Sequence, residues 1–343
     1  MRLIFGILVF VFLLTSCKVD PEVKMQLPSS DVVEVIPENW PLPAYTFSTN
    51  ILSENAFKLG RALFYEPMLS ADNTISCGSC HQRGVAFAHA GHNLSHGIND
   101  LTGTRNSPGL FNLNWHPYFM HDGGVNHIEV QPLAPITNTV EMAEALPNVI
   151  TKLKSSVKYQ QLFRNAFGED EITGERMMKA MAQFMGMMYS YKSKYDFVKQ
   201  GKDKFSEQEL KGYELFKAKC NNCHTEPLFS DFKFRNNGLS IHPVFKDTGR
   251  AHITSLKEDR YKFKTPSLRN VEVTWPYMHD GRYETLNECL NFYSGSIRNQ
   301  ENLDPLVQNG IQLSDEEKTQ LIEFLKTLTD YNFINDKRFD DPN

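Results

Sequence analysis

Two five-residue runs share one pattern of cysteine and histidine. Residues 77–81 read Cys-Gly-Ser-Cys-His, and residues 220–224 read Cys-Asn-Asn-Cys-His. With 6 cysteines and 11 histidines in 343 residues, roughly 0.003 such runs are expected by chance. A redox-active cysteine pair or half of a zinc site needs no histidine after the second cysteine. The pattern predicts two c-type haems, held by Cys77, Cys80 and His81 and by Cys220, Cys223 and His224.

Longer matching segments surround the two runs. A Gly-x-x-Leu-Phe segment precedes each run, and a His-Asp-Gly segment follows each. Pro108 lies 13 residues before His121, and Pro266 lies 13 residues before His279. Turn chemistry alone does not reproduce such a spacing. We therefore predict a mainly α fold: two cytochrome c-like helical domains from a tandem duplication, each wrapping one covalently bound haem, with long loops.

The length and charge of the chain set limits on its organisation. A chain of 343 residues can form two domains with separate cores. We place the N-terminal haem domain at residues 51–200 and the C-terminal one at residues 201–335. The net charge of −5 argues against nucleic acid as a partner, because nucleic acid requires a basic face.

The N-terminus has the features of an export signal. Arg2 precedes the apolar run 3–14, which is too short to span a bilayer. The run ends in Leu-Thr-Ser-Cys, the pattern of a bacterial lipobox. We expect residues 1–16 to be a lipoprotein signal peptide and Cys17 to carry a membrane anchor, so that the protein is exported to the periplasm. An ordinary signal peptide is the alternative. Residues 17–50, rich in Pro, Ser and Asp, are predicted to be a tether.

Periodicity predicts the helices that connect the two haem runs. Apolar residues recur at intervals of three and four over residues 141–167 and 173–197. Ser206 and Ser314 each stand three residues before a glutamate, which is the spacing of a capping box. We expect helices to begin at both serines, the first running towards the second haem run.

Several segments together resemble one family. They are the haem runs, the Arg-Asn-x-Pro segment at 105–108, the two His-Asp-Gly segments, Glu141-Met142 and the Leu-Arg-Asn-Val segment at 268–271. From about Ala56 to about Leu328 the chain resembles the bacterial di-haem cytochrome c peroxidases, the family that includes MauG, the maturation enzyme of methylamine dehydrogenase. The resemblance implies reduction of hydrogen peroxide to water at the N-terminal haem. It also implies that the C-terminal haem receives electrons from a small cytochrome c or cupredoxin; a homodimer is left open.

The resemblance assigns roles to side chains near the first haem. Gln131 and Glu141 match the pair on its distal side. A carboxylate there can move a proton between the peroxide oxygens, and an amide can hold the peroxide. Glu129 is the nearest rival for the acid–base role. The alternative for Glu141 is a purely structural role as an acid in the first turn of a helix, stabilised by the helix dipole.

The resemblance also implies a calcium ion between the two domains. Asn106, Thr274 and the carbonyl group of Pro276 match the positions that bind it. Oxygen ligands of this kind suit calcium. The expected cofactors are therefore two covalently attached haem c groups and one calcium ion.

The chain departs from the family at the residue between the haems. His121 replaces a tryptophan that serves other members as a station for electron transfer. An imidazole is harder to oxidise than an indole. Electrons would then use Trp115 or Trp275, or His121 would only be a packed, hydrogen-bonded residue.

The remaining departures concern the distal position of each iron. His96 is the candidate distal ligand of the first haem, with His89 and His92 nearby as alternatives; an open haem is the other outcome. Tyr293 is the candidate distal ligand of the second haem, where many members have a methionine. Met278 is close in sequence, but the first copy also carries a methionine before its His-Asp-Gly segment. A phenolate lowers the potential of the iron, and a thioether raises it.

Three functions follow from these residues. The leading hypothesis is a cytochrome c peroxidase that takes electrons from a small carrier. A second is a MauG-like oxidase that forms high-valent iron and oxidises a protein substrate. The third is a lipid-anchored electron carrier without catalysis, in which Gln131 and Glu141 would have no role.

Overall fold

The computed structural model describes residues 32–342. The predicted signal peptide, the predicted lipid attachment site Cys17 and the first part of the predicted tether lie outside this range. Within it, no helix combines the length and apolar character needed to cross a membrane.

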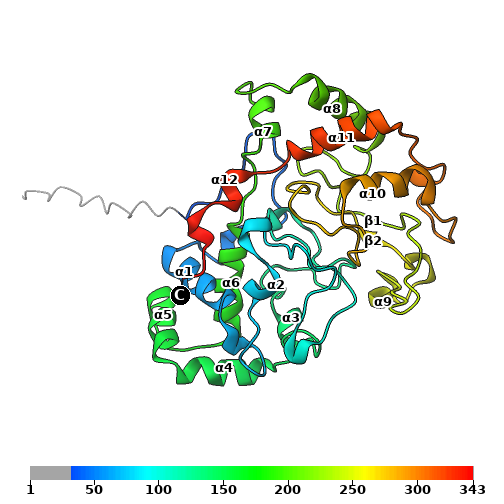
Figure 1. The fold of residues 1–343 in the computed structure, drawn as a ribbon. Coiled ribbons are helices and arrows are strands. Elements are labelled where there is room, and N and C mark those ends of the chain that lie inside the picture. Colours follow the sequence, from blue (N-terminus) through cyan, green and yellow to red (C-terminus); the bar gives the residue numbers. More distant parts are fainter. Residues whose placement is uncertain (1–31, 343) are drawn as a thin grey trace, which may run out of the picture. The chain divides into compact units, whose positions relative to one another are not determined.

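Helices joined by long loops make up most of the described chain, as Figure 1 shows. The prediction of a mainly α fold is therefore confirmed. Within residues 32–342 the strands are two short ones that pair antiparallel, β1 (Phe234–Arg235) with β2 (Phe263–Lys264). The helices are α1 Glu54–Phe64, α2 Cys77–Cys80, α3 Leu133–Thr137, α4 Leu146–Ser155, α5 Val157–Phe167, α6 Gly174–Gly186, α7 Lys194–Lys199, α8 Glu207–Lys219, α9 Ala251–Thr254, α10 Leu286–Asn291, α11 Asp315–Lys326 and α12 Tyr331–Ile334, with a π-helical turn at Phe292–Ser296.

Helices α1 and α6 cross in close contact in the N-terminal half. Gly60 makes this possible, because a Cβ atom at this position would overlap the carbonyl oxygen of Ala180. Phe64, one turn further along α1, packs against Phe184 of α6 with ring centroids 5.2 Å apart. Both phenylalanines are buried.

Helices α8 and α11 repeat this arrangement in the C-terminal half (Figure 1). A Cβ atom at Gly212 would overlap the carbonyl oxygen of Gln320. Phe216 packs against Phe324 at 5.1 Å, and both rings are fully buried. The Gly-x-x-Leu-Phe segments of the sequence therefore mark two equivalent helix crossings.

Some helix boundaries differ from the prediction. The sequence predicts a helix from residue 141, but α4 begins at Leu146. Pro147 lies in the first turn of α4, where proline is favoured. The predicted helix is interrupted at Ser156, whose backbone is extended. The predicted capping boxes are confirmed: Ser206 caps α8 and Ser314 caps α11, each accepting from the backbone N–H of the glutamate three residues later.

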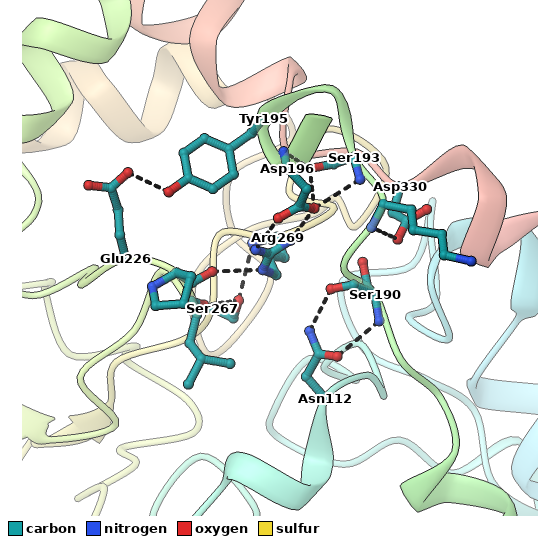
Figure 2. A network of polar contacts seen from close by, with 12 residues as sticks. Asn112, Ser190, Ser193, Tyr195, Asp196, Glu226, Ser267, Arg269 and Asp330 are labelled. Carbon is teal, nitrogen blue, oxygen red and sulfur yellow. Dashed lines mark hydrogen bonds and ion pairs between the residues drawn. The ribbon is translucent and has the colours of Figure 1, made fainter. Parts of the chain in front are cut away.

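The helix predicted over residues 173–197 ends at Gly186 and resumes only at α7. The side chain of Asn112 explains the interruption, because it exchanges two 2.9 Å hydrogen bonds with the backbone of Ser190 (Figure 2). These bonds satisfy backbone groups that a continuous helix would otherwise pair internally.

The second half of the predicted tether is packed against the core. Tyr45 and Phe47 are buried, and the ring of Trp40 lies edge-on to that of Trp115 with centroids 5.0 Å apart. The guanidinium carbon of Arg269 lies 4.6 Å from the centroid of Trp40. Residues 32–50 are therefore not the unstructured spacer that their composition predicted, because their aromatic side chains have partners in both halves of the chain.

A buried ion pair anchors the connection between the halves (Figure 2). Arg269 is completely buried, and its two terminal nitrogens donate to the two oxygens of Asp196 at 2.9 and 2.8 Å. Its Nε donates to the carbonyl oxygen of Pro227, and Ser193 donates to the same carboxylate. A buried charge is tolerated only with this degree of pairing.

The two glycine crossings predict a matched pair of stability effects. Gly60→Ala and Gly212→Ala each force two helices apart, which costs about 1–3 kcal/mol of overpacking and outweighs the helix propensity gained. We expect both to lower the free energy of unfolding of the holoprotein in denaturant titrations followed by circular dichroism. Gly84→Ala is the control, because Gly84 is exposed and nothing lies within 4 Å of its Cβ position. Unchanged stability in both crossing variants would contradict the close contact.

Candidate haem site

The first Cys-x-x-Cys-His run forms the short helix α2 and the residue that ends it. The ring of His81 is oriented by its Nδ1, which donates to the carbonyl oxygen of Phe87 at 2.7 Å, since a carbonyl can only accept. Burial lowers the pKa of His81 to about 4, so the imidazole is neutral. Its Nε2 is then free to bind a metal. A hydrogen bond at the other ring nitrogen commonly orients a histidine for this purpose.

The second run follows the end of α8 and repeats this geometry. Nδ1 of His224 lies 3.1 Å from the carbonyl oxygen of Pro266 and 3.2 Å from that of Phe229. Burial lowers the pKa of His224 as well. Phe229 packs on Phe216, as Phe87 packs on Phe64, so that an equivalent pair of aromatic rings supports each histidine.

One continuous cavity of about 970 Å³ contains both runs on its wall. This volume lies at the upper end of the range of about 300–1,000 Å³ for small-molecule sites. The four thiols of the runs are not in disulfides. Apolar side chains of both halves line the cavity, among them Phe64, Leu113, Phe119, Phe216, Leu268 and Leu290. Two free thiols, a neutral imidazole and an apolar wall in each half fit covalently attached haem.

Glu141 and Gln131 lie on the wall of this cavity with the first run. Burial raises the pKa of Glu141, although its Oε1 accepts a 2.6 Å hydrogen bond from Nδ2 of Asn138. Glu141 stands in a turn before α4, so it is not a first-turn helix acid. Glu129 instead accepts a hydrogen bond from the hydroxyl of Tyr45 and lies off the cavity wall.

The three histidines of the segment before Arg105 form a cluster. His96 lies on the cavity wall, and its Nδ1 is 2.6 Å from an oxygen of Asp100. His89 and His92 stack with centroids 4.4 Å apart behind it and do not line the cavity. Of the three, His96 is placed to reach a haem.

His121 also lies on the cavity wall, whereas the two tryptophans do not. Its Nε2 is 2.9 Å from the carbonyl oxygen of Asn106, and burial lowers its pKa to about 4. Trp115 is buried and donates to the carbonyl oxygen of Pro41, and Trp275 is 38% exposed. His121 thus presents a neutral, hydrogen-bonded imidazole on the cavity wall.

Tyr293 lies on the cavity wall in the π-helical turn that follows α10. Its hydroxyl accepts a 3.2 Å hydrogen bond from Nδ2 of Asn237, and burial raises its pKa to about 12. The same amide lies 3.9 Å from the sulfur of Met278, which also lines the cavity. The structure thus places both the predicted ligand and its rival on the wall.

The three predicted calcium ligands, Asn106, Thr274 and Pro276, all line the cavity. Nδ2 of Asn106 donates to the carbonyl oxygens of His92 and Asn93. Its Oδ1 accepts no hydrogen bond from a protein group within residues 32–342, so an oxygen remains available there.

A charged cluster on the cavity wall was not predicted from the sequence. Arg105 pairs with Asp122 at 2.5 Å and binds both oxygens of Asp247, at 2.6 and 2.9 Å. Its guanidinium also lies 5.7 Å from the ring centroid of Phe263, and Lys264 follows on the same strand. The Arg-Asn-x-Pro segment singled out Arg105, but nothing in the sequence indicated that its partner would be residue 247.

Comparisons with known proteins agree with this geometry. The family model described as di-haem cytochrome c peroxidase matches residues 54–204. The chain is 33% identical to the methylamine utilization protein MauG of Methylorubrum extorquens over 298 residues, covering 85% of this chain and 82% of that protein. It is 32% identical to the cytochrome c551 peroxidase of Nitrosomonas europaea over 287 residues, covering 81% and 82%.

A solved structure shows the same fold. The crystal structure of a MauG-like protein associated with microbial copper homeostasis superposes with a TM-score of 0.81 at 32% identity, covering 90% of this chain and 98% of that one. With the relatives above, this confirms the resemblance seen in the sequence. The chain belongs to the di-haem cytochrome c peroxidase family.

Proposed function

We propose that this protein reduces hydrogen peroxide to water with electrons from a small cytochrome c or cupredoxin. One peroxide takes up two electrons and two protons and yields two waters. The single observation that carries the proposal is the half-buried Glu141, with its raised pKa, on the wall of the cavity that also holds His81. Each haem, when bound, supplies an iron that can exchange electrons and bind oxygen ligands.

The residues around the first run have distinct roles in this proposal. Glu141 accepts a proton from the peroxide oxygen nearer the metal and returns it to the leaving oxygen. Asn138 holds the carboxylate through Oε1, which leaves Oε2 free for this transfer. Gln131 on the same wall holds the substrate, and the apolar surroundings exclude water.

The whole chain fits a duplicated arrangement. Two cytochrome c-like domains are supported by the two glycine crossings, the two aromatic clusters and the two carbonyl-bound histidines. We place the division near residue 200.

The proposal also includes periplasmic export, a lipid anchor at Cys17, His96 as distal ligand of the first haem, and calcium bound by Asn106, Thr274 and Pro276.

A MauG-like oxidase of a protein substrate is the second candidate. It is favoured by Tyr293 on the cavity wall and by the similarity to MauG. The two functions differ in their use of the carrier. A peroxidase oxidises two equivalents of reduced cytochrome c for each peroxide consumed, whereas the oxidase leaves the carrier reduced and modifies a protein side chain.

Glu141→Gln tests the acid–base role. We expect peroxide turnover with reduced cytochrome c to fall about 100- to 10,000-fold, because general acid–base catalysis contributes that much. Glu141 must be ionised to accept the first proton, and burial raises its pKa above the ordinary 4.5. The wild-type rate should therefore fall at acid pH, beginning above pH 4.5, and this limb should be missing in the variant.

Glu129→Gln is the matched control for that experiment. Glu129 lies off the cavity wall and is bound by Tyr45, so its variant should keep turnover within a few-fold of wild type. Full activity in Glu141→Gln, or an equal loss in both variants, would refute the assignment.

Tyr293→Met tests the distal ligand of the second haem. A thioether in place of a phenolate should raise the midpoint potential of one haem, measured by spectroelectrochemical titration. Met278→Leu is the control and should leave both potentials unchanged. If Met278→Leu changes a potential and Tyr293→Met does not, Met278 is the ligand and the assignment of Tyr293 is wrong.

A further inference from the structure

Lys264 is a cation on the cavity wall whose position is fixed by the fold. It lies on β2, where it pairs with Phe234 of β1, and its backbone N–H donates to the carbonyl oxygen of His121 at 2.7 Å. Its side chain lines the cavity that contains both haem runs. Lys264 therefore borders the space that a haem would fill.

Two of the three N–H groups of its ammonium have partners. Nζ donates to the carbonyl oxygen of Tyr118 at 2.7 Å and lies 3.3 Å from Nδ1 of His116. An ammonium can only donate, so Nδ1 of His116 is the acceptor. Burial, followed by the charge of Lys264, keeps the pKa of His116 well below its ordinary value, which is consistent with a neutral ring.

The charge of Lys264 has no carboxylate partner among residues 32–342. The charge of Asp122 acts on Lys264. Both oxygens of Asp122 already accept hydrogen bonds, one from Arg105 and the other from the backbone N–H of Gly124. Burial lowers the pKa of Lys264 to about 7. A cation in such surroundings is costly unless an anion reaches it.

Haem brings such an anion into this cavity. Its propionate carboxylates lie on the edge of the ring away from the vinyl groups that bond the cysteines. We propose that Lys264 binds a haem propionate, with its third N–H donating to that carboxylate. The proposal rests on haem binding and not on the peroxide reaction.

Midpoint potentials of the holoprotein test this pairing. Lys264→Gln removes a cation next to one haem, which makes that haem harder to reduce, so its midpoint should fall while the other stays. Lys264→Arg keeps the charge and should stay close to wild type. Lys257→Gln removes the same charge from a side chain that is 67% exposed, and it should change neither midpoint. Two unchanged midpoints in Lys264→Gln would overturn the proposal.

Infrared difference spectra then identify the carboxylate. The spectrum of wild type minus Lys264→Gln should contain a carboxylate band that moves when the propionate carbons of haem carry ¹³C. A band that does not move would assign Lys264 to a protein carboxylate such as Asp122 and overturn the proposal. If Lys264→Gln fails to retain one haem, retention in Lys264→Arg supports the pairing, and loss in both overturns it.

Discussion

The close contact of two helix pairs is the constraint on which the rest of the structure depends. Gly60 and Gly212 let the helices approach until Phe64 and Phe216 reach their partners on the crossing helices. Phe87 and Phe229 pack against those rings, and their carbonyl oxygens lie within hydrogen-bond distance of His81 and His224. The lack of a side chain at each glycine thus permits the ring packing that places the carbonyl oxygen beside each imidazole.

The two halves share this scaffold but present different chemistry to the cavity. Near the first run the wall carries a half-buried carboxylate, Glu141, and an amide, Gln131. Near the second it carries the phenol of Tyr293, bound by Asn237. In the proposed duplication the two halves hold a cofactor in equivalent ways, and the different residues at these wall positions separate the proposed reacting site from the proposed electron-handling one.

The sequence predicted what depends on short-range pattern. The haem runs, the capping boxes at Ser206 and Ser314, and the equivalence of the two glycine segments can all be read within a few residues. The turn that holds Glu141 could not, because the periodicity of the next helix extends over it. The partner of Arg105 could not either, since the pairing with Asp247 joins segments 142 residues apart. The composition of residues 32–50 suggested a spacer. A few aromatic side chains of this segment nevertheless pack against the core and hold it in place.

The docking of that segment has a consequence for the order of assembly. Trp40 is near the beginning of the chain, yet the guanidinium under its ring belongs to Arg269. During synthesis the contact of Trp40 with Trp115 can therefore form first, whereas its contact with Arg269 must wait until the C-terminal half emerges. Contacts of such long sequence separation form late and fold slowly. The docking of residues 32–50 is therefore complete only once both halves of the chain have been made.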